Sequence, residues 1–158
     1  MSVEELARLV VLDVVIVAVW TLAVGATAPR WPTRWLNSDA GPLRLRTVDA
    51  PTTYARLRVR RWGARLPEAG AVFGGRSKRA LPGRSPSELE GYLVEVRRAE
   101  WVHWLSMLCI VPVAVIGPWW LAGAFAVVIL LVNLPFIVIL RHNRIRLLSL
   151  LRRSERVV

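Results

Sequence analysis

The chain has 158 residues, of which 54% are hydrophobic, and it carries a formal net charge of +11. It contains apolar runs of about 20 residues, which a membrane-spanning helix needs and a soluble nucleic-acid-binding protein lacks. The composition therefore indicates a small integral membrane protein and excludes a basic nucleic-acid-binding domain. The single Cys109 excludes a disulfide framework or a cysteine-based metal site within one chain.

The first apolar run, residues 9–28, is long enough to span a bilayer core of about 30 Å at about 1.5 Å per residue. A cleaved signal peptide is the alternative, since Ala26-Thr27-Ala28 resembles a cleavage site, but the N-terminal flank is acidic rather than basic. We expect a retained transmembrane helix within residues 1–29. Asp13 is interpreted as a partly solvated carboxylate near the headgroups, with a functional intramembrane acid as the alternative.

Residues 30–84 form a basic section rich in proline and glycine, which we expect to be an irregular cytoplasmic or interfacial segment. Within it, residues 54–62 alternate apolar and basic side chains with a period of two. This alternation predicts a short strand or an extended segment on the membrane surface. Anionic lipid headgroups are the expected partner of so many arginines.

Residues 85–140 are predicted to form an amphipathic helix that leads into a transmembrane hairpin. The helix should begin at Ser85-Pro86-Ser87-Glu88, which has the capping-box pattern with proline at the first helical position. The second apolar run, residues 102–116, ends at Gly117-Pro118. The third run, residues 119–140, follows at once, so the two helices must be antiparallel.

The last section, residues 141–158, is predicted to be a basic amphipathic tail that begins where the third helix ends. The expected fold class is all-α, with about three transmembrane helices: one at the N-terminus and then the C-terminal hairpin. The middle section and the tail are basic, whereas the N-terminal flank is not. The positive-inside rule therefore predicts a multi-pass cell-membrane protein with the N-terminus outside and the two basic sections in the cytoplasm.

A candidate active site lies where the second helix begins and the third ends, because an antiparallel hairpin brings these ends to one membrane face. Glu100 and His103 are three residues apart and share a helix face there. We interpret them as a pair in which the carboxylate orients the imidazole for acid/base catalysis. The alternative is an interfacial histidine beside a snorkelling glutamate. No metal is expected, because a di-iron site would need a second Glu-x-x-His pair.

Other polar residues are expected near this pair. Ser106, one turn deeper, is either a nucleophile or a hydroxyl bonded to its own helix. Asn133 and Pro135 are predicted to interrupt the third helix, and Asn133 either compensates locally for a freed carbonyl or reaches the substrate or a catalytic partner. The further candidates for binding a substrate or an oxyanion are Arg98, Trp104, Arg141, Asn143, Arg144 and Arg146.

Two spaced blocks of these residues resemble the glycosyl-4,4'-diaponeurosporenoate acyltransferase family. The first block, residues 98–106, reads Arg-Ala-Glu, two residues, His-Trp, one residue and Ser. The second, residues 133–147, contains Asn-x-Pro and then Arg-x-Asn-Arg-x-Arg-Leu. Weaker agreement covers Arg61-Trp62 and Leu66-Pro67 with Gly70.

The chain departs from the family pattern at three positions. Gly63 stands where the family has a basic residue, Leu140 where it has a polar one, and His142 where it has an aromatic one. The common membrane acyltransferase signature, a histidine followed five residues later by aspartate, is also absent from this chain.

The resemblance implies transfer of a fatty acyl group from a thioester to a sugar hydroxyl of a membrane glycolipid, such as a glycosylated carotenoid. The donor would be acyl-CoA or an acyl carrier protein, with no tightly bound cofactor. We expect His103, oriented by Glu100, to deprotonate the hydroxyl while Asn143 or Arg144 steadies the oxyanion. The alternatives are a membrane methyltransferase or reductase of lipids or isoprenoids, and a non-enzymatic membrane scaffold. A homo-oligomer is compatible with the sequence.

Overall fold

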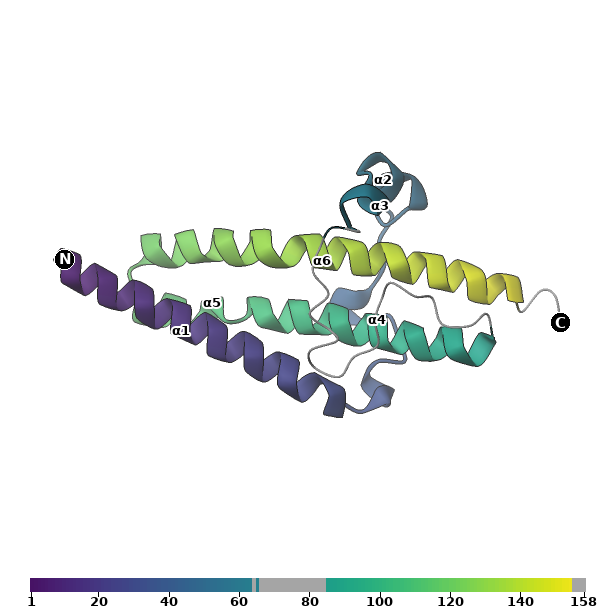
Figure 1. Ribbon diagram of the computed structural model, residues 1–158, viewed down its shortest axis with the longest axis horizontal. Coiled ribbons are helices and arrows are strands. Elements are labelled where there is room, and N and C mark those ends of the chain that lie inside the picture. Colours follow the sequence, from purple (N-terminus) through teal and green to yellow (C-terminus); the bar gives the residue numbers. More distant parts are fainter. Residues whose placement is uncertain (64, 66–84, 155–158) are drawn as a thin grey trace.

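The computed structural model describes residues 1–63, 65 and 85–154, and the regular elements in this part of the chain are all helical. Three long helical stretches run along the long axis of the molecule (Figure 1). By length and composition they can cross a membrane, and they comprise Val3–Arg30, Pro86–Ile116 and Trp119–Ser154. The predicted all-α fold, with one N-terminal helix and a C-terminal hairpin, is confirmed. Leu66, Pro67 and Gly70 lie outside the described residues.

Helix α1, Val3–Thr27, begins with a capping box in which Ser2 and Glu5 each accept a backbone hydrogen bond from the other. Asp13 is ten residues into this helix, about 15 Å from its start. Its side chain is fully buried, and Oδ2 lies 3.8 Å from the position that a Cβ on Gly117 would occupy. The expectation of a partly solvated carboxylate was therefore wrong, because the turn at Gly117 covers it.

Helix α4, Pro86–Met107, starts at the predicted capping box, with Ser85 accepting from the N–H of Glu88. After a break, the chain continues as α5, Ile110–Ile116. Pro112 accounts for this break, because it has no N–H for the carbonyl of Leu108 and its ring crowds that carbonyl. The apolar run expected to form one helix is thus divided between two.

Helix α6, Trp119–Ser154, is continuous for 36 residues. The predicted interruption at Pro135 and the predicted helix end at Leu140 were therefore wrong, and residues 141–154 of the basic tail are the last part of α6. At about 1.5 Å per residue, 36 residues reach about 54 Å, well beyond a bilayer core of about 30 Å. One end of α6 must therefore project from the membrane.

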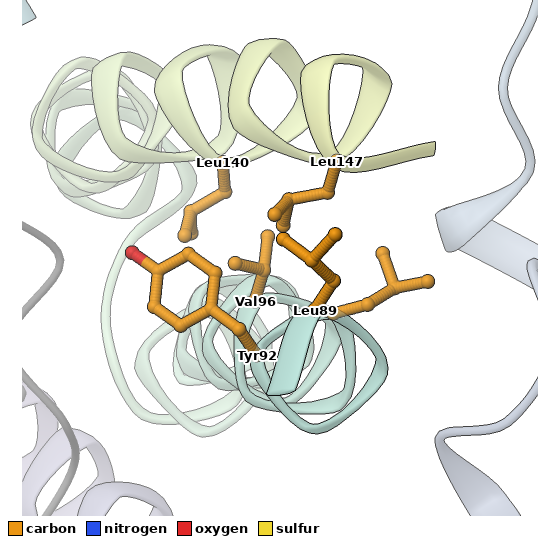
Figure 2. Close-up of a cluster of buried hydrophobic side chains, with 6 residues drawn as sticks. Leu89, Tyr92, Val96, Leu140 and Leu147 are labelled. Carbon is orange, nitrogen blue, oxygen red and sulfur yellow. The ribbon is translucent and has the colours of Figure 1, made fainter. Parts of the chain in front are cut away.

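The first half of α4 and the second half of α6 share a hydrophobic core. Figure 2 shows Leu140 and Leu147 of α6 pointing toward Leu89, Tyr92 and Val96 of α4. These residues recur at helical spacing, so each helix presents one apolar stripe to the other. Leu140, which departs from the family pattern, is 1% exposed in this core.

Residues 30–63, here called the collar, lie against both α4 and α6 at the level where α1 ends (Figure 1). The collar contains two short α-helices, α2 (Pro51–Arg56) and α3 (Val59–Gly63). The region also holds three single-turn 3-10 helices: η1 (Ala28–Arg30), η2 (Thr33–Trp35) and η3 (Gly41–Leu43).

The prediction of a strand or extended segment over residues 54–62 was wrong. Pro51 occupies the first position of α2, which favours a helix start. Arg58 has a φ of 51°, and this left-handed residue separates α2 from α3. The two helices bury Tyr54 and Val59, so their apolar residues face the protein rather than alternating across a sheet.

Gly63 provides a test of how the collar packs on α6. A Cβ at this position would lie 3.1 Å from Cδ1 of Ile139, so the side chain of Ile139 fills the space. We expect Gly63→Arg to push α3 away and to lower stability by about 1–3 kcal/mol, as overpacking does. Thermal unfolding in detergent measures the change, and Gly63→Arg combined with Ile139→Ala should recover most of it. A melting temperature of Gly63→Arg equal to that of the wild type would mean that α3 does not pack on α6 there.

Candidate active site

Glu100 on α4 is fully buried and faces basic residues of α6. Its Oε1 accepts from Nε of Arg141 at 2.9 Å and from the indole of Trp104 at 3.4 Å. Its Oε2 lies 3.3 Å from Nη1 of Arg144. Four predicted site residues therefore meet. Among the described residues, Glu100 makes no hydrogen bond to His103, so the prediction that it orients this imidazole was wrong.

Arg141 uses all three of its guanidinium nitrogens within the protein. Besides the bond to Glu100, Nη1 donates to Asp49 at 2.8 Å and Nη2 donates to the carbonyl of Pro42. The guanidinium carbon also lies 6.0 Å from the ring centre of Trp104, within reach of a cation–π interaction. These contacts engage every guanidinium nitrogen of Arg141 with Glu100 or the collar, so its first role is to hold these parts of the chain together.

Two more arginines bind the collar from the same side. Arg144 is fully buried, donates to the carbonyl of Leu43, and has Nη1 3.5 Å from Asp39. Arg97 donates to Asp39 at 2.8 Å and to the carbonyl of Leu36 at 3.3 Å. Buried charges are tolerated when they are paired. The cluster meets this condition with three guanidinium groups and three carboxylates: Arg97, Arg141, Arg144, Asp39, Asp49 and Glu100.

The carboxylate of Asp49 accepts three hydrogen bonds from the described residues. It accepts from the backbone N–H of Arg46 at 2.8 Å and from the hydroxyl of Tyr54, in addition to Arg141. Burial opposes the charged form, but these hydrogen bonds and the charge of Arg141 hold the pKa of Asp49 below its usual value. Burial and the Asp49 carboxylate raise the pKa of Tyr54, so its hydroxyl remains a donor.

His103 lies one turn along α4 from Glu100 and faces a different part of α6. Its Nδ1 is 3.0 Å from Oδ1 of Asn133, and its ring stacks on Phe136 with a centroid separation of 4.8 Å. The Asn133 amide NH₂ donates to the carbonyl of Ile129 at 2.9 Å, so its oxygen is the end that faces His103. Nδ1 therefore carries a proton, and in the neutral ring Nε2 is the basic nitrogen.

The other predicted site residues lie apart from these two groups. Ser106 is buried, and its hydroxyl has no hydrogen-bond partner in the described part of the chain, so it bonds neither to His103 nor to its own helix. Arg98 pairs with Glu95 of α4. Asn143 is half-buried and Arg146 is exposed. Within residues 1–63, 65 and 85–154, no group of three or more His, Cys, Asp or Glu could hold a metal ion.

Sequence reasoning missed the two collar carboxylates and Arg97. A signal for the carboxylates was present, because Asp39 and Asp49 are the only acidic residues between positions 30 and 63. Isolated acids in a strongly basic segment are candidates for pairing with arginines elsewhere. Which arginines they pair with depends on how the collar lies against α4 and α6, which sequence spacing does not specify.

Comparison with known proteins relates most of the chain to one family. Residues 32–153 match the family model described as glycosyl-4,4'-diaponeurosporenoate acyltransferase. The protein of that name from Staphylococcus haemolyticus (strain JCSC1435) is 36% identical over 93 residues, which cover 58% of this chain and 53% of the relative. The protein of that name from Staphylococcus aureus (strain USA300) is 37% identical over 71 residues, or 44% and 41%. The alignments thus span about half the length of these curated relatives. No solved structure matches.

Asp49 tests whether the ion pairs hold the collar in place. Asp49→Ala leaves Arg141, whose side chain is 14% exposed, without one of its two carboxylates. We expect a loss of about 3 kcal/mol, the lower end for breaking a buried pair. Tyr54→Phe removes one hydrogen bond to the same carboxylate and should cost about 1.5–3 kcal/mol. Thermal unfolding in detergent at neutral pH measures both. An unchanged melting temperature for Asp49→Ala would show that the pair does not stabilise the fold.

The pH dependence of unfolding adds an independent measurement. Because the folded-state pKa of Asp49 lies below the ordinary value of 3.8, its contribution to stability is present above 3.8 and is lost as the pH falls through the folded value. The wild type should therefore lose stability in acid, and Asp49→Ala should lose less. Parallel acid profiles of the two proteins would contradict the assignment.

Proposed function

The chain belongs to the glycosyl-4,4'-diaponeurosporenoate acyltransferase family, and from this premise we propose that it transfers a fatty acyl group to a sugar hydroxyl of a membrane glycolipid, such as a glycosylated carotenoid. The matched residues, 32–153, include nearly all of the collar and every candidate site residue. The three helices able to cross a membrane suit an acceptor that is itself a lipid.

We propose His103 as the general base of this transfer. The observation that carries the assignment is the His103–Asn133 hydrogen bond, in which Nδ1–H donates to the amide oxygen, so that Nε2 is the basic nitrogen of the neutral ring. Nε2 takes the proton of the sugar hydroxyl as its oxygen attacks the thioester carbonyl. The new C–O bond forms, the C–S bond breaks, and the departing thiolate recovers the proton as a free thiol.

The arginines near Glu100 have a different role in this proposal from the one expected from sequence. Arg141 donates to Glu100, to Asp49 and to the carbonyl of Pro42, so we assign it to holding the collar beside the site rather than to binding the oxyanion. Nε and Nη1 of Arg144 have no hydrogen-bond partner among the described residues. Arg144 is fully buried and its Nη1 is paired with Glu100 and Asp39, so the half-buried Asn143 next to it is the donor that we propose to steady the oxyanion.

The proposed orientation follows from charge. The collar and the end of α6 are basic and lie on the cytoplasmic side, and the N-terminus lies outside. The site then opens toward the compartment that supplies soluble acyl thioesters. Acyl-CoA and acyl carrier protein thioesters both remain donors to be assayed.

Replacing His103 tests the proposed chemistry. His103→Ala should lower acyl transfer by about 10²–10⁴-fold, the usual contribution of a general base, while the protein still inserts in the membrane. The measurement is transfer of a labelled acyl group in membranes, with lipid mass spectrometry to identify the acylated product. Ser106→Ala is the matched control and should retain activity because Ser106 takes no part in the step. Full activity of His103→Ala would remove the proposal.

Asn133 is proposed as a positioning residue that acts through His103. Asn133→Leu keeps the bulk but removes the bond to Nδ1, so we expect kcat to fall on the order of tenfold or more with little change in KM. Combining it with His103→Ala should produce no further loss, because the two residues act as one unit. Additive losses would assign Asn133 a separate role.

A further inference from the structure

The outer surface of the collar carries unpaired positive charge. All eight arginines between positions 30 and 63 are exposed, and none of them forms an ion pair with another described residue. The two acidic residues of the collar, Asp39 and Asp49, bind Arg97, Arg141 and Arg144 of the long helices instead. The charge of the collar arginines is therefore not neutralised locally.

The collar also exposes large apolar side chains. Trp35 is 60% exposed, Val48 65% and Leu57 54%. Apolar area in contact with water is unfavourable, and contact with lipid relieves it. Tryptophan in particular is enriched at the membrane–water interface. The exposed arginines and apolar side chains of the collar therefore suit contact with a bilayer better than contact with water alone.

The position of the collar agrees with this chemistry. It begins at Arg30, directly after the apolar run of α1, and in Figure 1 the segment after α1 and helices α2 and α3 lie at the level where α1 ends. A spanning helix fixes the depth of its own end. The collar is therefore at the headgroup level of one leaflet.

Arg58 is an independent indication that the positive charge of the collar serves binding rather than folding. Its φ of 51° lies in the left-handed region, where glycine and asparagine are favoured over arginine. Its side chain is exposed and makes no hydrogen bond or ion pair with the other described residues. The fold of the described residues thus gains nothing from an arginine at this position.

We propose that the collar is a binding surface for anionic lipid headgroups, with its arginines on the lipid phosphates and with Trp35 and Leu57 inserted among the lipids. Guanidinium groups bind phosphate through paired hydrogen bonds. The exposed apolar side chains favour a membrane over a soluble polyanion such as coenzyme A. This role is independent of the acyl-transfer reaction.

Trypsin cleavage reports directly on this surface, because trypsin cuts after arginine. The full-length protein is placed in nanodiscs of phosphatidylcholine alone or of equal parts phosphatidylcholine and phosphatidylglycerol. Cleavage within residues 30–63 is followed by mass spectrometry and normalised to cleavage after Arg152 and Arg153, which are exposed near the end of α6. We expect several-fold slower cleavage with phosphatidylglycerol and loss of the difference at high salt. Equal rates in the two discs would overturn the proposal.

Paired substitutions distinguish an effect of the collar arginines from an effect of the net charge of the protein. Arg56→Gln with Arg60→Gln should remove at least half of the protection measured at other collar arginines. Arg152→Gln with Arg153→Gln changes the net charge equally and should leave that protection intact. Because this pair removes the reference cleavage sites, its collar cleavage is normalised to a soluble trypsin substrate added to each reaction. If both pairs reduce protection to the same extent, the effect belongs to net charge and not to the collar.

Two further measurements distinguish the remaining explanations. Arg58→Gly should keep or raise the melting temperature, because it relieves the left-handed residue, yet should lower protection. A fall in the melting temperature with unchanged protection would make Arg58 structural and contradict its proposed role. If coenzyme A protects the collar in phosphatidylcholine discs and phosphatidylglycerol does not, the surface binds a soluble polyanion and the proposal is wrong.

Discussion

The guanidinium group of Arg141 joins three parts of the chain that are far apart in sequence. Its partners Glu100, Asp49 and Pro42 are 41, 92 and 99 residues away, respectively. Two of these partners are carboxylates, which compensate the cost of removing most of the Arg141 guanidinium from water. Apolar packing sets the register of α4 against α6, and Arg141 then places the collar on that pair. The site cannot form before all three segments have met.

This arrangement gives neighbouring residues of α4 separate tasks. Glu100 is fully buried and already holds Arg141 and the indole of Trp104, so it is not placed to exchange a proton with substrate. His103, one turn away, is only half-buried and is held by an uncharged amide and a stacked ring. An amide orients the imidazole without the strong charge of a carboxylate. The charged cluster therefore supports the collar, and the His103–Asn133 pair is the part suited to proton transfer.

Sequence patterns predicted what depends on local chemistry. The lengths of the apolar runs indicated three spans, and the capping box indicated the start of α4 at Ser85. Patterns failed where tertiary contacts decide the outcome. Pro135 was predicted to break the third helix, but α6 continues through it. Pro112, for which no break was predicted, divides α4 from α5. The partners of Asp49 depend on how the collar lies against α6, which no spacing along the chain encodes.

The three departures from the family pattern now have a common location. Gly63 lies against Ile139 where α3 packs on α6, and Leu140 is in the core between α4 and α6. The ring of His142 packs at a tilt against Tyr54, the residue that donates to Asp49, with ring centres 5.4 Å apart. All three substitutions therefore change contacts made by one stretch of α6, two of them with the collar. His103 and Asn133 belong to the two blocks on which the resemblance to the family rests, whereas the three departures lie where the neighbouring helices and the collar pack.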